Sequence, residues 1–256
     1  MKVVILAGGY GSRLGDETSV KPKPMVEIGD MPILWHIMKI YSLHGLNEFI
    51  ICLGYKGYLI KEYFSNYFLH NSDVTIDIQK NKTEIHHSTN EPWKITLVET
   101  GEETMTGGRL KRVSKYLDDD NFCFTYGDGL GDIDISSLIK FHLNQGNDAT
   151  VTAVRPEGRF GTIKVDEKNL AVSFNEKIED TNSWINAGFF VLSPKVIDLI
   201  DGDDTIWEQE PLNILSNTGR LSVFKHNSFW RPMDTLRDKQ LLDKLVTNKN
   251  APWIKW

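Results

Sequence analysis

The chain has 256 residues, a length that suits one large domain or one domain with an appendage. Hydrophobic residues make up 40% of it and charged residues 25%, as in globular proteins that bury a substantial core. The formal net charge of −6 argues against a general nucleic-acid-binding protein, which needs a basic face. A small phosphorylated ligand remains compatible with this charge, because a few local cations suffice to bind it.

The composition also bears on the compartment of the protein. No apolar run is long enough to span a membrane, and the run before Gly8 is too short for a signal peptide. The two cysteines, Cys52 and Cys123, lie in apolar, strand-like segments. They indicate buried, reduced thiols and not a disulfide or a metal cluster. These features predict a cytoplasmic protein without a membrane partner.

A strand followed by a glycine-rich loop opens the chain. The apolar, β-branched run over residues 3–7 predicts a buried, parallel strand. Gly8, Gly9 and Gly11 then form a loop with almost no side chains, so its backbone amides can approach a ligand closely. Amides in such a loop bind phosphate oxygens well.

Two cations follow this loop. Arg13 stands at its far end, where a guanidinium can bind a phosphate through two parallel hydrogen bonds. Lys23 lies between Pro22 and Pro24, which restrict the backbone and present the lysine rigidly. The loop and the two cations together predict a site for nucleotide phosphates.

Two other phosphate-binding loops do not fit the sequence. A dinucleotide-binding G-x-G-x-x-G that starts at Gly9 lacks its third glycine, because Leu14 occupies that position. The chain also contains no G-x-x-x-x-G-K-[ST]. For the glycine loop taken alone, an ordinary tight turn between a strand and a helix remains the alternative.

Strands and helices alternate along the chain. The apolar spacing predicts a helix over 31–45, a strand over 48–53 and a helix over 57–68, which favours a parallel sheet with helices on both faces. Further strands are predicted at 94–98, 121–126, 149–154, 162–165, 171–174, 184–192 and 221–224, and helices at 107–117, 206–218 and 235–246. The predicted fold is α/β: an open, mostly parallel (mixed), Rossmann-like sheet flanked by helices. It forms one domain over 1–256 with a smaller C-terminal part over about 195–256.

The segment over about 69–95 interrupts this alternation. Val74, Ile76 and Ile78 alternate with polar residues, which is typical of a half-exposed strand. His86 and His87 are adjacent, so they point in different directions and give no ligand spacing for zinc. We expect this insertion to be a subunit contact.

Two aspartates stand at informative positions. Asp128 follows the strand over 121–126 and is flanked by glycines, where open α/β sheets bind their ligands. Asp234 precedes the last predicted helix, and capping of that helix is its simplest interpretation.

Several sequence elements together resemble the sugar-phosphate nucleotidyltransferases. They are V-I-L-A-G-G-x-G-x-R-L, K-P-K-P-M-V, T-Y-G-D-G, F-x-E-K, N-A-G-F-F-V-L and W-x-P-M-D-T, and they are spread over essentially the whole chain. Ile178 departs from the pattern, since the family usually has proline after F-x-E-K. Segments 32–38, 105–112, 207–212 and 229–238 resemble the branch that transfers a cytidylyl group. Thymidylyl- and uridylyltransferases usually carry Q-P-x-G-L-A where this chain has T-G-G-R-L at 106–110.

The resemblance implies a reaction of CTP with α-D-glucose 1-phosphate that gives CDP-glucose and pyrophosphate. The sugar phosphate would attack the α-phosphorus in line, with Mg²⁺ as the cofactor. A hexose-1-phosphate transferase that uses UTP or dTTP is one alternative, and a non-catalytic nucleotide-sugar sensor is another. The resemblance further implies a homo-oligomer, with a hexamer as the expected state.

The resemblance also assigns roles to individual residues. Arg13 and Lys23 would be catalytic, and Asp128 and Asp234 would bind the metal, which replaces the capping interpretation of Asp234. The sugar phosphate would be bound by Glu176, Lys177, Asn186 and Gly188. The nucleotide would be bound by Leu6, Ala7, Gly8, Gly9, Gly11, Ser12, Arg13, Lys23, Thr104, Arg109, Gly127 and Asp128.

Overall fold

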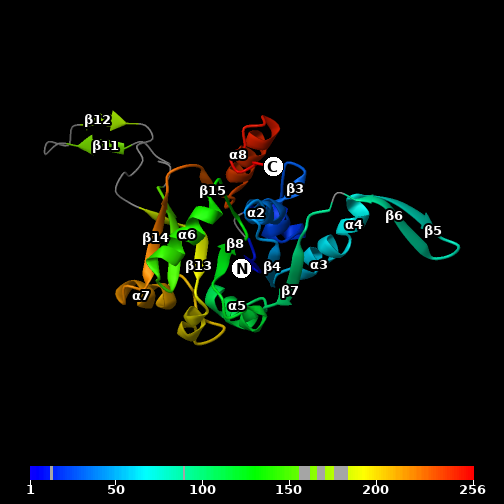
Figure 1. Cartoon of the computed structure of the whole chain (residues 1–256). Coiled ribbons are helices and arrows are strands. Elements are labelled where there is room, and N and C mark those ends of the chain that lie inside the picture. The colour runs from blue at the N-terminus through cyan, green and yellow to red at the C-terminus, as the bar shows by residue number, and fades with distance from the viewer. Residues whose placement is uncertain (12–13, 89, 156–161, 166–170, 176–183) are drawn as a thin grey trace.

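A seven-stranded mixed sheet forms the centre of the structure, which is a computed structural model (Figure 1). The structure describes the chain apart from residues 12–13, 89, 156–161, 166–170 and 176–183. The strand order is β14-β10-β13-β8-β1-β4-β7. In that order the strands span Leu221–His226, Ala149–Val154, Ile185–Leu192, Phe122–Tyr126, Val3–Ala7, Glu48–Leu53 and Lys94–Glu99. Strand β13 runs antiparallel to β10 and β8, and the other neighbours are parallel, which confirms the predicted mixed sheet.

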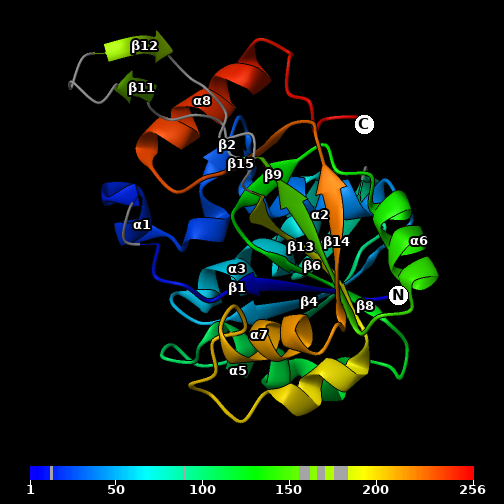
Figure 2. The same ribbon diagram turned by 90° about the vertical axis from the view of Figure 1, so that its left-hand side faces the viewer.

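The central strand β1 shows how the sequence builds two cores. Its register places Val3 beside Phe49 of β4 and Cys123 of β8. Side chains alternate between the two faces of a strand. Val3 and Ile5 therefore belong to the core under α2 (Ile33–Ser42), whereas Val4 belongs to the core under α5 (Thr106–Val113). Figure 2 shows these two helices on opposite sides of the sheet.

Further helices are found in the described part of the chain. They are α1 (Asp16–Val20), α3 (Gly57–Ser65), α4 (Tyr67–His70), α6 (Ile135–Gln145), α7 (Glu210–Asn217) and α8 (Leu236–Thr247), with 3₁₀ turns at Lys23–Met25, Ser114–Tyr116 and Pro194–Leu199. Several predicted helices are shorter than expected. The predicted helix over 57–68 is divided at Asn66, and the helix predicted from 206 begins at Glu210, where Pro211 occupies its first turn.

Short two-stranded ribbons complete the fold. Strands β5 (Ser72–Asp77) and β6 (Lys82–Ser88) form an antiparallel hairpin that projects away from the sheet beyond β7 (Figure 1). β2 (Glu27–Ile28) pairs with β3 (Met31–Pro32), and β11 (Thr162–Val165) pairs with β12 (Ala171–Asn175). β9 (Gly129–Gly131) pairs with β15 (Trp230–Pro232). The last ribbon joins the end of β8 to the segment before α8, and the candidate site depends on it.

Two further expectations concern the whole chain. Cys52 and Cys123 are free and fully buried, as predicted, and burial raises the pKa of each thiol to about 12. In the part of the chain that the structure describes, no helix is both long and apolar enough to cross a membrane.

Candidate active site

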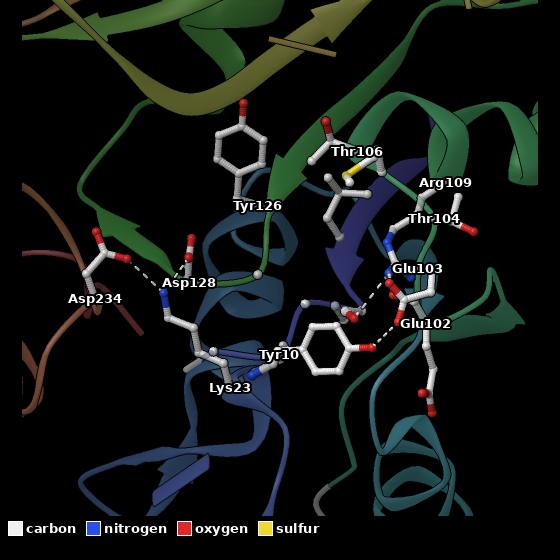
Figure 3. Close-up of a pocket in the computed structure, with 18 residues that line it drawn as sticks. Tyr10, Lys23, Glu102, Glu103, Thr104, Thr106, Arg109, Tyr126, Asp128 and Asp234 are labelled. Carbon is white, nitrogen blue, oxygen red and sulfur yellow. Dashed lines mark hydrogen bonds and ion pairs between the residues drawn. The ribbon is translucent and has the colours of Figure 1, made fainter. Parts of the chain in front are cut away.

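A cavity of about 480 Å³ opens at the carboxyl ends of the parallel strands (Figure 3). Its walls come from the loop after β1, from Lys23, from the segment after β7 and from the residues that follow β8. All predicted nucleotide-binding residues that the structure describes line it: Leu6, Ala7, Gly8, Gly9, Gly11, Lys23, Thr104, Arg109, Gly127 and Asp128. Ser12 and Arg13 lie outside the described residues.

The loop after β1 requires glycine at two positions, because a Cβ there would collide with the side chains packed beneath it. A side chain on Gly8 would meet the guanidinium of Arg109 at 2.0 Å. Gly11 has a φ of +65°, and a Cβ there would meet the Cβ of Lys23 at 2.9 Å. The loop is therefore closely packed on its inner side, and its outer side faces the cavity.

Arg109 lies beneath this loop and binds it through the backbone. Its side chain donates hydrogen bonds to the carbonyls of Gly8 (3.2 Å), Leu53 (3.1 Å) and Glu102 (3.0 Å) and to the hydroxyl of Thr100 (2.9 Å). Burial lowers the pKa of this guanidinium. One buried cation thus joins the ends of β1, β4 and β7, which carry the walls of the cavity.

The same contacts orient the peptide groups of the loop. The carbonyl of Gly8 accepts a hydrogen bond from the amide of Tyr55 (3.2 Å) as well as from Arg109. In a trans peptide the carbonyl and the following N–H point in opposite directions, and the described chain has no cis peptide. The amide of Gly9 is therefore directed away from Arg109, on the side where Gly9 lines the cavity.

Lys23 bridges the two aspartates at the far end of the cavity (Figure 3). Its ammonium lies 2.7 Å from Asp128 and 2.9 Å from Asp234. Burial by itself lowers the pKa of Lys23, but the charge and hydrogen bond of Asp128, joined by those of Asp234, outweigh it and raise the pKa. Pro22 and Pro24 hold the short 3₁₀ turn that carries the lysine, as their positions in the sequence predict.

The β9–β15 ribbon brings the two carboxylates together. Gly129 of β9 pairs with Pro232 of β15, and the amide of Met233 donates to the carbonyl of Asp128 at 2.8 Å. Asp234 follows directly and turns toward Lys23. Lys23 is separated from Asp128 by 105 positions and from Asp234 by 211, so only the fold makes this cluster.

Asp234 does not cap the last helix, so the simplest local interpretation of this residue, which the resemblance had already replaced, does not hold. The N-cap of α8 is Thr235, whose hydroxyl accepts the amide of Asp238, while the Asp238 carboxylate accepts the amide of Thr235. This reciprocal capping box satisfies the helix start without Asp234. The carboxylate of Asp234 is thereby left to face Lys23 and the cavity.

The two aspartates fit a hard divalent cation. Their oxygens converge on one point, which the ammonium of Lys23 already marks as a cation position, and about a third of each side chain is exposed. Among the described residues no group of three potential ligands is found. A pair of carboxylates suits Mg²⁺ that completes its shell with waters and substrate phosphates.

Asn186 and Gly188, predicted for the sugar phosphate, lie on β13 beside the cavity wall formed by Tyr126. The amide of Asn186 donates to the hydroxyl of Tyr126 at 3.1 Å. A side chain on Gly188 would meet the ring of Tyr126 at 2.4 Å. Glu176 and Lys177, the other two predicted sugar-phosphate residues, lie outside the described residues.

Sequence reasoning missed several residues of this site. Tyr10 lines the cavity, and its hydroxyl donates to Glu103 at 2.6 Å across the mouth (Figure 3). Tyr126 and Thr106 line it as well, and both donate to the carboxylate of Glu208. Tyr126 and Glu208 stand inside motifs that carry the resemblance, which was the available signal.

The fold and this cavity define a nucleotide-handling α/β protein, and comparison with known proteins identifies its class. The family model for nucleotidyl transferases matches residues 2–227. The chain belongs to the nucleotidyl transferase family.

Relatives and solved structures narrow the class. A Salmonella typhi protein named glucose-1-phosphate cytidylyltransferase is 59% identical over 100% of both chains. A Bacillus subtilis protein named probable glucose-1-phosphate cytidylyltransferase is 44% identical, again over 100% of both chains. The crystal structure of HddC from Yersinia pseudotuberculosis superposes with a TM-score of 0.70 at 25% identity, covering 96% of this chain and 99% of that one. The resemblance predicted from the sequence is thereby confirmed.

Proposed function

We propose that this protein transfers CMP from CTP to α-D-glucose 1-phosphate, forming CDP-glucose and releasing pyrophosphate. The observation that carries this proposal is the full-length similarity to proteins named glucose-1-phosphate cytidylyltransferase, at 59% identity. The cavity supports it physically, because it combines a glycine loop with a lysine and two carboxylates. These are the parts that phosphoryl transfer requires, namely positioning and compensation of charge.

The chain's own groups can perform the positioning. Amides of the loop from Gly8 to Gly11 hold the nucleotide phosphates, and Arg109 keeps those amides in place from below. An oxygen of the sugar phosphate attacks the α-phosphorus in line. Lys23 stabilises negative charge at the α-phosphate or at the attacking phosphate during this step. Arg13 neutralises the departing β- and γ-phosphates.

We assign the metal site to Asp128 and Asp234, with Mg²⁺ as the ion. When bound, the ion screens the negative charge shared by the reacting phosphates. The carboxylates of Asp128 and Asp234 would hold it on the Lys23 side of the cavity.

We place the sugar phosphate beyond Tyr126, with Asn186 and Gly188 on β13 and with Glu176 and Lys177 from the segment that precedes β13 in the sequence. Thr104 is assigned to the nucleotide side. Arg109 contributes to that side through the loop, since four of its N–H groups already bond to protein atoms.

The proposal extends to the assembly. The chain is one catalytic domain with a smaller C-terminal part, and it functions in the cytoplasm as a homo-oligomer. The β5–β6 hairpin and the adjoining α4 present the exposed apolar side chains Phe68, Leu69, Ile76, Ile78 and Ile85, and a second copy of this chain is the partner that we assign to them. Deletion of the hairpin should lower the mass measured by light scattering, and an unchanged mass would contradict the assignment.

Pyrophosphate release tests the activity. The protein is incubated with glucose 1-phosphate, Mg²⁺ and each of CTP, UTP, dTTP and ATP in turn. Release with CTP alone is the expected result. Pyrophosphate release with UTP or dTTP would support the mechanism but contradict the choice of nucleotide. If a protein that binds CTP releases no pyrophosphate with any of the four nucleotides, a sensor is favoured.

A further inference from the structure

The carboxylate of Glu208 accepts two hydroxyl hydrogens at the wall of the cavity. It comes from the turn before α7, is half-buried, and lies 2.5 Å from the hydroxyl of Tyr126 and 2.6 Å from that of Thr106. Within the described part of the chain no ion pair is found for it. An ionised carboxylate can only accept hydrogen bonds, so both hydroxyls must donate to it.

This requirement fixes the hydrogen-bond direction at Tyr126. With its proton directed to Glu208, the phenol oxygen accepts the side-chain amide of Asn186 at 3.1 Å. Burial raises the pKa of Tyr126, and the charge of Glu208 raises it further, so the phenol stays protonated. The hydroxyl of Tyr126 therefore donates to Glu208 and accepts from Asn186, and the opposite arrangement is excluded.

Asn186 is oriented at both ends as a result. Its side-chain oxygen accepts the amide of Gly188 at 2.7 Å, while its nitrogen donates to Tyr126. An asparagine amide carries two N–H groups, and the second finds no acceptor in the described part of the chain. Because the side chain is exposed, that N–H is available to a ligand oxygen.

Packing holds the ring of Tyr126 as firmly as the hydrogen bonds hold its hydroxyl. Phe124 and Phe190 meet it edge to face, with ring centroids 6.2 and 6.0 Å away. Gly188, at a φ of +79°, leaves the space that the ring occupies. The register between β10 and β13 shifts just here, and such a bulge re-aims the side chains that follow it.

We infer that Glu208 is a positioning residue, which acts through the hydroxyl of Tyr126 to aim the free N–H of Asn186 at a hydroxyl oxygen of the hexosyl phosphate. This inference rests on the proposed function and deepens it. The same carboxylate accepts a hydrogen bond from Thr106 and so holds the first turn of α5. The hydroxyl of Thr106 also accepts a hydrogen bond from the amide of Trp207 at 2.9 Å. Glu208 therefore connects the nucleotide wall of the cavity to its sugar wall.

Glu208→Gln tests this role with almost no change of shape. A glutamine presents one oxygen and one NH₂, so one of the two hydroxyls meets a donor where it met an acceptor. The KM for glucose 1-phosphate should rise about three- to tenfold, the cost of one misdirected hydrogen bond, while kcat stays within about twofold. Glu210→Gln, an exposed neighbour in the first turn of α7, is the matched control and should change neither constant.

A double-mutant cycle separates positioning from general stability. Tyr126→Phe removes the hydroxyl and keeps the ring, so it should reproduce the rise in KM. If Glu208 acts through Tyr126, the double variant should be no worse than Tyr126→Phe alone. Additive effects on KM, or a lowered melting temperature with an unchanged KM, would overturn the inference.

The activity of the wild type shows whether the proposed function or the positioning role has failed. If the wild type releases pyrophosphate with a nucleotide other than CTP, the cycle is run with that nucleotide and the inference is judged as before. If the wild type turns over no nucleotide, the proposed function has failed, and the cycle is run on the dissociation constant for glucose 1-phosphate measured by calorimetry. A KM or dissociation constant that Glu208→Gln leaves unchanged in a folded protein would refute the positioning role.

Discussion

Replacement of Lys23 by alanine should strengthen metal binding in the absence of nucleotide while it abolishes most of the activity. The ammonium of Lys23 lies 2.7 and 2.9 Å from the carboxylates of Asp128 and Asp234, in the position that a divalent cation would share. In the substrate-free protein the lysine therefore competes with the metal. Removing it leaves two carboxylates without a counter-ion, which should attract a cation more strongly.

The structure sets the size of this effect. The Lys23 side chain is 14% exposed and the two carboxylates are 31% and 32% exposed, so solvent screens both ion pairs in part. Ion pairs of this kind are worth at most about 1 kcal/mol each. Loss of both should therefore tighten metal binding by about five- to thirtyfold. Turnover should fall by about 10²–10³, as expected when a preorganised cation is removed from phosphoryl transfer.

Mn²⁺ is a suitable probe, because it prefers the same oxygen ligands as Mg²⁺ and can be followed by electron paramagnetic resonance. The dissociation constant is measured without nucleotide for the wild type and for Lys23→Ala. Lys21→Ala is the matched control, since this nearby lysine pairs with the exposed Glu27 and should leave Mn²⁺ affinity unchanged. Equal or weaker Mn²⁺ binding by a folded Lys23→Ala protein would refute competition. Tighter binding that survives Asp128→Asn would place the metal elsewhere.

Three further predictions concern stability and reactivity. Thr235→Ala should lower the free energy of unfolding by about 1 kcal/mol in denaturant titrations, because it removes the cap of α8. Asp234→Asn should instead weaken the Mg²⁺ dependence of the activity and leave the free energy of unfolding nearly unchanged. Cys52 and Cys123 should resist a thiol reagent at neutral pH until the protein unfolds, since burial raises each pKa to about 12; fast labelling of the native protein would contradict this. Burial lowers the pKa of His36 below 6.5, so its contribution to stability is complete above that pH and is lost as the pH falls toward the folded-state pKa. His36→Gln should flatten the loss of melting temperature between about pH 7.5 and about pH 5.5, and an unchanged slope would show that other groups cause it.

Local signals in the sequence were sufficient to predict the main strands and the residues of the glycine loop that line one side of the cavity. β-branched runs over a few residues predicted strands such as Val3–Ala7 and Glu48–Leu53 with their observed bounds. The glycines after the first strand predicted a close backbone approach, and Asp128 was placed at a strand end. Such features depend on neighbours along the chain, because the preferences of a strand or turn act over only a few residues.

Contacts between distant segments decided the rest. The sequence offered capping as the local interpretation of Asp234, but the β9–β15 ribbon turns this carboxylate toward Lys23 and leaves the cap to Thr235. Glu208 stands in a recognisable motif, yet the hydrogen bond that it accepts from Tyr126, 82 positions away, exists only in the folded chain.

Buried hydrogen bonds explain why these partners could not be predicted. Arg109 bonds to the carbonyls of Gly8, Leu53 and Glu102, which no spacing in the sequence singles out as acceptors. A buried polar group must find a partner within about 3 Å, and any carbonyl that the fold brings near can serve. The sequence by itself therefore determined the main strands, and it predicted candidate residues such as Lys23 and Asp128, which line the cavity. The tertiary structure decided how they are paired, because pairing depends on distances that exist only after the sheet has assembled.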